Sequence, residues 1–228
     1  LNTRYLMAYS SHEIVPHLRL ALSRGKKTLA MSVEHNREAK YSELTLATID
    51  SPGLFSQIAG VLAANSVNIL AAQIHTRKTG AVLDILQVNS PIAAAVDKPQ
   101  KWERIEADLC AVLEGRVFVE DLFEKCQEPD YLKKMSGTYP IKSNKVEIDN
   151  EVSDRFTVID VFAADKVGLL YEITRTLNEL GLYIAVSKIS TKVDQAADVF
   201  YVCDIFGQKI IDLVKLEEIR TVMLNRLA

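Results

Sequence analysis

The stretch DSPGLF at residues 50–55 returns as DKVGLL at residues 165–170, a constant 115 residues further along the chain. Eight residues recur at this offset: Asp50, Gly53, Leu54, Ile58, Leu62, Ile69, Ile74 and Thr76 return as Asp165, Gly168, Leu169, Ile173, Leu177, Ile184, Ile189 and Thr191. Self-similarity at a fixed period is typical of a duplicated structural unit. The chain of 228 residues is therefore predicted to contain two copies of one module.

Apolar spacing predicts the elements of the first copy. The stretch 52–65 places Leu54, Ile58 and Leu62 on one face, as in an amphipathic helix that covers a sheet. The Ser-Pro pair at 51–52 is expected to cap this helix and to fill its first position. The other expected elements are strands 28–33, 41–49, 68–77 and 81–89 and a helix from Asp97 that Gly115 ends.

The second copy repeats this order with strand 156–163, helix 168–180, a hairpin over 183–192 and 196–204, and helix 211–227. Strand–helix–strand–strand–helix is most of a βαββαβ ferredoxin-like sandwich, which lacks only its last strand. Short apolar segments at 31–33 and 146–148 stand at the same distance upstream of each copy. We therefore predict an α+β fold with two ferredoxin-like sandwiches in tandem, each permuted so that its edge strand comes from upstream.

The segments around the copies predict the domain boundaries. A helix capped by Ser10 and running to about Arg24 forms an N-terminal lead-in over residues 1–27. The first module is assigned to 28–127, a linker rich in Pro, Gly and Ser to 128–143, and the second module to 144–228.

Strand 156–163 carries apolar residues on both faces, so something is expected to cover the open face of its sheet. The other copy, the N-terminal helix and a second chain are the candidates; contact between the two copies is the favoured cover, and a homodimer is the second expectation.

Composition excludes several classes of function. A formal net charge of −3 gives no electrostatic basis for binding nucleic acid, and no apolar run approaches the ~20 residues of a membrane helix. Three cysteines, odd in number and far apart, favour reduced thiols in the cytoplasm over disulfides. The chain begins with Leu1 and has no signal-peptide pattern, so a cytoplasmic fragment of a longer protein is expected.

The turn from the first core strand into the first helix of each copy is the candidate binding site. Backbone N–H groups at a helix N-terminus favour a small anion such as a carboxylate, and Gly53 and Gly168 let a ligand approach closely. Asp50 and Asp165 at the same turns can accept a hydrogen bond from an ammonium group. The pattern is chemically suited to a free amino acid, although a turn and a helix cap alone also use Gly and Asp.

Other polar residues carry less chemical information. Asn68 offers an amide at the start of a strand, but Tyr183 stands at the equivalent position of the second copy, so unequal sites are expected. Asp84 and Asp198 recur within strands and are expected on a solvated strand face. The four histidines form no metal-ligand cluster, and no nucleophile stands with a base. The chain is predicted to be non-catalytic, with no metal and no cofactor.

The Asp-x-x-Gly-Leu turn, the helix after it and the Asn-Ile start of the next strand resemble the ACT-domain family of small-molecule-sensing regulatory modules. Longer strings are similar to the two ACT domains of the bacterial uridylyltransferase/uridylyl-removing family, which modifies the PII nitrogen-regulatory protein. They are PGLFSQIAG at 52–60 in the first copy, and VEIDN at 146–150, GLLY at 168–171 and DVFYV at 198–202 in the second.

This resemblance implies a C-terminal regulatory region that senses glutamine and shifts the catalytic domains of the same chain from adding UMP to PII toward removing it. It also implies two ligand sites: Asp50, Ser51, Gly53, Leu54 and Asn68 in the first, and Asp165, Lys166, Gly168 and Leu169 in the second, weaker one. Two alternatives stay open, namely a structural or dimerisation module without a ligand and a tandem ACT regulator of another enzyme.

Overall fold

The computed structural model describes residues 3–77, 79–89, 98–125, 144–164, 166, 168–189, 191–192 and 195–227. Its helices are α1 (Thr3–Ala8), α2 (Ser11–Arg24), α3 (Leu54–Ala64), α4 (Pro99–Leu113), α5 (Val119–Lys125), α7 (Leu169–Glu179) and α8 (Leu213–Leu227). Its strands are β1 (Ala30–Asn36), β2 (Tyr41–Ile49), β3 (Asn68–Thr76), β4 (Ala81–Asn89), β5 (Lys145–Asp149), β6 (Thr157–Ala164), β7 (Tyr183–Lys188), β8 (Thr191–Lys192) and β9 (Gln195–Cys203).

These elements confirm the predicted order, with the strand expected at 183–192 divided into β7 and β8. Helices α1 and α5 are additional to the prediction. The expected linker at 128–143 lies outside the described residues.

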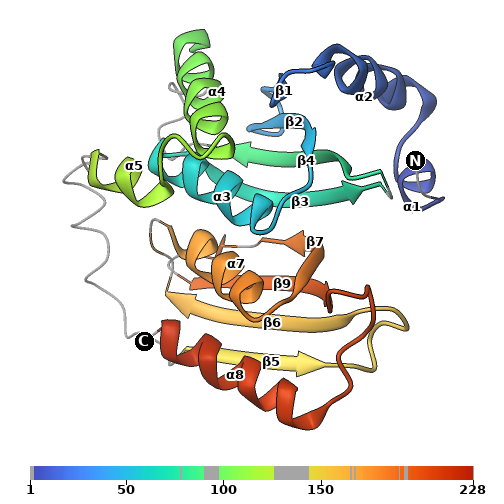
Figure 1. Cartoon of the computed structure of the whole chain (residues 1–228), viewed down its shortest axis with the longest axis vertical. Coiled ribbons are helices and arrows are strands. Elements are labelled where there is room, and N and C mark those ends of the chain that lie inside the picture. The colour runs from blue at the N-terminus through green and yellow to red at the C-terminus, as the bar shows by residue number, and fades with distance from the viewer. Residues whose placement is uncertain are drawn as a thin grey trace.

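All the strands belong to one antiparallel sheet in the order β1-β2-β4-β3-β7-β9-β6-β5, and β8 pairs with β9 (Figure 1). The first module contributes β1 to β4 and the second β5 to β9. The two modules join edge to edge where β3 pairs with β7 at three positions, Ala71↔Lys188, Ala72↔Ser187 and Gln73↔Val186. The tandem is therefore one continuous sheet and not two sandwiches stacked face to face.

Each module takes its edge strand from the segment upstream of it, as predicted. β1 pairs with β2 from Ala30↔Ala47 onward, and β5 pairs with β6 from Lys145↔Phe162 onward. The upstream strand of each hairpin therefore occupies the sheet edge at which the last strand of a βαββαβ sandwich normally pairs. The α+β class and the tandem of ferredoxin-like sandwiches are confirmed.

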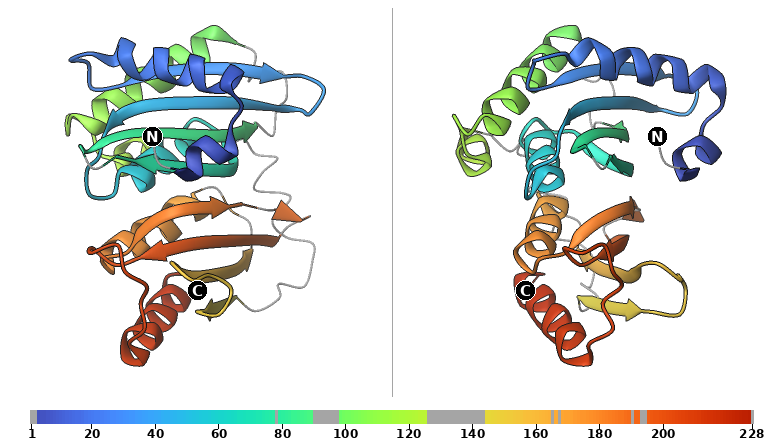
Figure 2. Two further views of the ribbon diagram at one scale, coloured as in Figure 1. Left: turned by 90° about the vertical axis from the view of Figure 1, so that its right-hand side faces the viewer. Right: turned by 45° about the vertical axis from the view of Figure 1, so that its right-hand side comes forward.

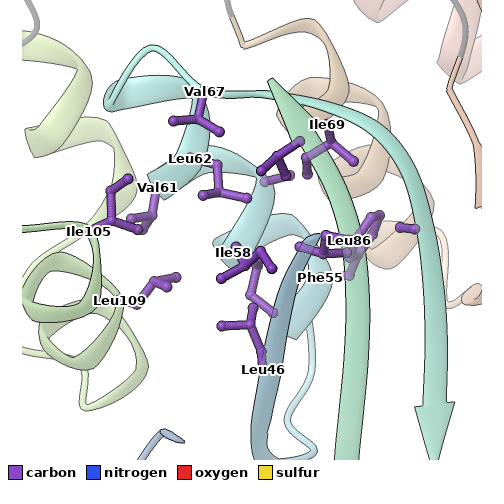
Figure 3. Packing of buried hydrophobic residues seen from close by; sticks show 14 of the residues in the cluster. Leu46, Phe55, Ile58, Val61, Leu62, Val67, Ile69, Leu86, Ile105 and Leu109 are labelled. Carbon is purple, nitrogen blue, oxygen red and sulfur yellow. The ribbon is translucent and has the colours of Figure 1, made fainter. Parts of the chain in front are cut away.

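Helices cover one face of the sheet and form a hydrophobic core in each module. Figure 3 shows Ile58 of α3 near the strand residues Leu46 and Leu86, with Leu109 of α4 beside them. The core of the second module includes Ile159, Val161, Ile173, Leu177, Phe200 and Ile219. The helical periodicity in the sequence therefore identified the buried faces of α3 and α7 correctly.

α3 and α7 pack against each other across the junction of the modules, and α5 packs against α3 (Figure 1). Gly60 lies inside α3, where a methyl group would meet Val119 of α5 and lie 2.9 Å from Cδ2 of Tyr171 in α7. The Tyr171 hydroxyl donates a hydrogen bond to Oε1 of Glu120 in α5 at 2.8 Å. α5 was not predicted because a helix of seven residues is too short for a clear periodicity.

The N-terminal helices cover the opposite face of the sheet in the first module (Figure 2). α2 contacts β1 and β2, and the fully buried Tyr5 of α1 is hydrogen-bonded through its hydroxyl to Nδ1 of His17 at 2.8 Å. The expectation that the two copies cover each other's open faces is therefore wrong, because the copies meet at strand edges.

Asp84 and Asp198 face the hydrophobic cores, so the expectation of a solvated strand face is also wrong. Alternation along β4 puts Asp84 on the same side as Val82 and Leu86, which pack in the core beneath α3. The Asp84 side chain is fully buried, and neither carboxyl oxygen has a hydrogen-bond partner among the described residues. Asp198 is buried at the equivalent position of β9.

The close approach at Gly60 gives a first prediction. Replacing Gly60 with Ala should destabilise the protein by about 1–2 kcal/mol, because overpacking costs more than the roughly 1 kcal/mol that alanine gains in helix propensity. Urea unfolding measures this difference. In a Val119→Ala background the cost of Gly60→Ala should shrink, since the methyl group then has room. A Gly60→Ala protein more stable than the parent would contradict the packing.

Asp84 gives a second prediction, because burial raises the pKa of its carboxyl to about 7. The folded protein then holds a proton that the unfolded chain releases near pH 4, so stability falls as the pH rises from about 4 to 7. Asp84→Asn should remove this loss, which amounts to roughly 2–3 kcal/mol between pH 5 and pH 8. Urea unfolding at both pH values, with the exposed Asp154→Asn as control, tests it. An equal pH dependence in Asp84→Asn and the parent would refute it.

Candidate functional site

The first corner, residues 50–54, joins β2 to α3. The Asp50 N–H donates to the Gly80 carbonyl at 2.7 Å and so fixes the corner to the β3–β4 turn. Gly53 precedes α3 with a left-handed φ of +74°, so the helix begins at Leu54. The predicted Ser-Pro cap at 51–52 is therefore wrong, and no side chain in the described chain caps α3. The Leu54 N–H donates to the Ser51 carbonyl at 3.0 Å and the Gln57 N–H to the Gly53 carbonyl at 3.0 Å, which leaves the Phe55 and Ser56 N–H groups without a backbone acceptor among the described residues.

The second module contributes an amide to the first corner. A Cβ atom added to Gly53 would lie 3.2 Å from Nδ2 of Asn178, a residue near the end of α7. Asn178 is exposed, and among the described residues its side chain makes no hydrogen bond. The first corner therefore combines the start of a helix from one module with an amide from the other.

At the second corner, the described residues Lys166, Gly168 and Leu169 have different neighbours. Gly168 also has a left-handed φ, +82°, but a Cβ atom there would lie 3.2 Å from Cζ of Phe123 in α5. The Lys166 ammonium is paired with the Glu172 carboxylate at 2.9 Å, and Leu169 is buried in the core. Asp165 lies outside the described residues. The aromatic ring and the ion pair make this corner less suited to a ligand than the first.

Asn68 does not lie at the first corner. It opens β3 and pairs with Asn89 at one end of β4, whereas the first corner follows Ile49, which pairs with Ala81 at the other end. The separation arises because α3 carries the chain back along the sheet before β3 begins. β3 and β7 run antiparallel. Asn68 therefore lies at the same end of the sheet as the second corner, and its counterpart Tyr183 lies at the same end as the first corner.

Two carboxyl groups give the first corner its electrostatic character. Loss of solvent raises the pKa of the partly buried Asp50, against the opposing effect of a hydrogen bond from the Ser51 N–H. Burial raises the pKa of Asp84 further, and the charge of Asp50 adds to the effect. The His75 N–H approaches Asp84 and lowers its pKa somewhat, but without the geometry of a hydrogen bond.

Sequence reasoning missed Asn178 and Asp84. The signal for Asp84 was its position inside an apolar alternating strand, together with its recurrence as Asp198. Asn178 gave no local signal, because only the packing of α7 beside α3 brings it to the first corner.

The groups at the first corner are of the chemical kinds that recognise a small zwitterion. An uncapped helix start favours a carboxylate, an aspartate accepts from an ammonium group, and a side-chain amide both donates and accepts. Within the described residues no three His, Cys, Asp or Glu side chains converge as a metal site would require. No helix among those residues is long and apolar enough to span a bilayer.

Two comparisons concern the fold. Residues 145–228, which contain the second module, match the family described as the ACR9-like, ACT-like domain. The crystal structure of aspartate kinase from Synechocystis is similar over 80% of this chain and 26% of that one, at 12% identity. Its TM-score of 0.40 is too low to support an argument.

Sequence comparison reaches almost the whole chain. The bifunctional uridylyltransferase/uridylyl-removing enzyme of Rhodospirillum rubrum is 34% identical over 95% of this chain and 23% of its own length. The enzymes of the same name from Gluconobacter oxydans and Azospirillum brasilense are 33% and 34% identical, each over 98% of this chain and 24% of their own length. The chain thus spans about a quarter of these relatives. It is identified as a tandem ACT-like region related to that of the bifunctional uridylyltransferase/uridylyl-removing enzymes.

Proposed function

We propose that this region senses a free amino acid, glutamine in the first place, and controls the balance between adding UMP to the PII protein and removing it. The catalytic domains of the same parent chain carry out both reactions, and this region does no chemistry itself. The observation that carries the proposal is the first corner, where Asp50 precedes the start of α3, which has no side-chain cap, and Asn178 of α7 lies against Gly53.

Each part of glutamine has a suitable group at the first corner. The N–H groups at the start of α3 receive the α-carboxylate, and Asp50 accepts from the α-ammonium group. Asn178 pairs with the side-chain amide of the ligand, since one amide can donate to and accept from another. The second corner is not proposed as an equal site, because Phe123 packs against Gly168 there.

The position of the first corner also supports a regulatory role. Its groups come from two modules, so a ligand that contacts both has a higher affinity for one relative arrangement of α3 and α7 than for another. Such differential affinity is what allows a ligand to shift a conformational equilibrium. The names of the relatives, which describe two opposing activities, are consistent with a region that selects between them.

The second candidate function is association with another chain, including a second copy. Large apolar side chains are exposed in the segment before and at the start of α8: Ile205, Phe206, Ile211, Leu213 and Val214. An exposed apolar patch of this kind often marks an interface. This function would coexist with sensing, because the segment belongs to the second module and the first corner lies at the junction.

Calorimetry with glutamine tests the proposal directly. The unsubstituted chain should bind glutamine. The Asn178→Ala variant should bind it about tenfold more weakly, which is the effect of losing one to two hydrogen bonds. Asn68→Ala is the matched control and should bind as the parent does, because Asn68 lies at the other end of the sheet. No heat from the folded parent at millimolar glutamine would refute sensing. Loss of binding in Asn68→Ala instead of Asn178→Ala would move the site to the second corner.

The regulatory part of the proposal is tested in the full-length enzyme. Asn178→Ala should raise the glutamine concentration that half-switches the enzyme from adding to removing UMP by the same factor by which it weakens binding. The rates of both reactions at saturating glutamine should stay unchanged, since no reacting group is altered. If the variant switches at the same glutamine concentration as the unsubstituted enzyme, glutamine binding at this corner does not control the balance between adding and removing UMP.

A further inference from the structure

The sheet face opposite α3 and α7 is covered in the first module and open in the second. In the first module, α1 and α2 bury Ala47, Leu83 and Ile85 on this face, in a cluster that includes Tyr5. Figure 2 shows the strands of the second module on the side that carries α1 and α2, with none of the described helices over them. We call this surface of β5, β6, β7 and β9 the open face of the second module.

The open face is apolar at its centre. Every second residue of β6 and β9 packs in the core beneath α7, so the residues between them point to the other side of the sheet. The open face therefore carries these large apolar side chains: Val158, Phe162, Val186, Val199 and Tyr201. Apart from Val158, they are partly exposed. An apolar surface that no described helix covers is typical of an interface.

Charged residues give the open face a basic edge and an acidic edge. Strand pairing places Lys188 of β7, Asp160 of β6 and Glu147 of β5 on one line across the four strands. Glu147 is paired with Lys145 at 2.6 Å, whereas no ion pair to Asp160 is present among the described residues. Loss of solvent and the charges of Glu147 and Asp149 raise the pKa of Asp160. The side at β5 and β6 therefore has an excess of acid, and the side at β7 a cation.

The lead-in helices restrict how two such faces can stack. Two sheets pack face to face at a distance of about 10 Å with their strands nearly aligned. A two-fold axis across the strands would set the first modules over each other, on the face that α1 and α2 already occupy. A two-fold axis parallel to the strands instead reverses the strand order in the second copy, so that its first module lies beyond β5. This second arrangement leaves room for the helices.

We propose that the open face of the second module binds the same face of a second copy of this chain, about a two-fold axis parallel to the strands. β7 of each copy then lies over β5 of the other, and β9 over β6. Lys188 of one copy faces the edge that carries Glu147 and Asp160 in the other. Phe162 faces Ala197 of the second copy, because these two residues pair at one level within each sheet. Charge and side-chain size are thus both complementary in the arrangement that the helices allow.

The dimensions of the open face indicate a weak, reversible dimer. Four strands of five residues span about 19 by 17 Å, at spacings of about 4.8 Å between strands and about 3.4 Å along them. Two faces of this size together bury less than the roughly 1,200 Å² at which stable interfaces begin. α3 and α7 lie on the other side of the sheet, so the first corner stays accessible in the dimer. The inference therefore does not depend on glutamine binding.

Sedimentation velocity of the chain tests this arrangement by a charge swap. The unsubstituted chain should dimerise reversibly as its concentration rises to millimolar. Lys188→Glu should weaken the dimer about tenfold, because the symmetric interface contains the altered contact twice. Adding Glu147→Lys to this variant should restore most of the affinity, since opposite charges then face each other again. A double variant that dimerises as weakly as Lys188→Glu would overturn the arrangement.

The exposed apolar segment at the start of α8 provides the matched control. The variant Leu213→Ser/Val214→Ser should dimerise as the unsubstituted chain does, because both side chains lie outside the open face. If this variant loses the dimer while Lys188→Glu keeps it, the second copy binds the α8 segment and the proposal is wrong. A chain that stays monomeric at millimolar concentration also overturns it and leaves the open face to the catalytic domains of the parent chain. Circular dichroism of each variant confirms folding.

Discussion

The pairing of β3 with β7 is the contact on which the rest of this architecture depends. Three register positions join a four-stranded unit and a five-stranded unit into one sheet. Because the pairing is antiparallel, α3 and α7 come to lie side by side and each corner faces the other module. A ligand at a corner therefore touches both modules, which neither module alone could offer. Gly60, with Val119 and Tyr171 packed against it, allows the two helices to approach this closely.

The two corners started from the same sequence pattern but have different surroundings. At the second corner Phe123 of α5 packs on Gly168, and Lys166 is neutralised by Glu172. At the first corner an exposed amide, Asn178, stands where the second has an aromatic ring. Both turns share one sequence pattern, and Phe123 of α5 makes their surroundings unequal.

Strand β3 connects the first corner with the N-terminal helices. On one side of the sheet, the backbone of His75 lies near Asp84 in the core beneath α3. On the other side, the His75 ring packs edge-on against Tyr5 of α1 and lies near Tyr9, at centre distances of 5.0 and 6.1 Å. β3 thus contacts both the core beneath α3 and the lead-in helices. Packed interfaces of this kind respond by discrete rearrangement more than by gradual deformation.

The sequence alone determined the repeat, the order of the elements, the upstream edge strands and the buried faces of the helices, because all of these follow from spacing within one module. It did not determine how the modules join, since the register of β3 on β7 is set between residues 113 to 117 positions apart. Tertiary structure therefore decided that Asn68 is absent from the first corner and that Asn178 is present. It also placed Asp84 in the core, because the side of a strand that faces the helices depends on pairing with both neighbours.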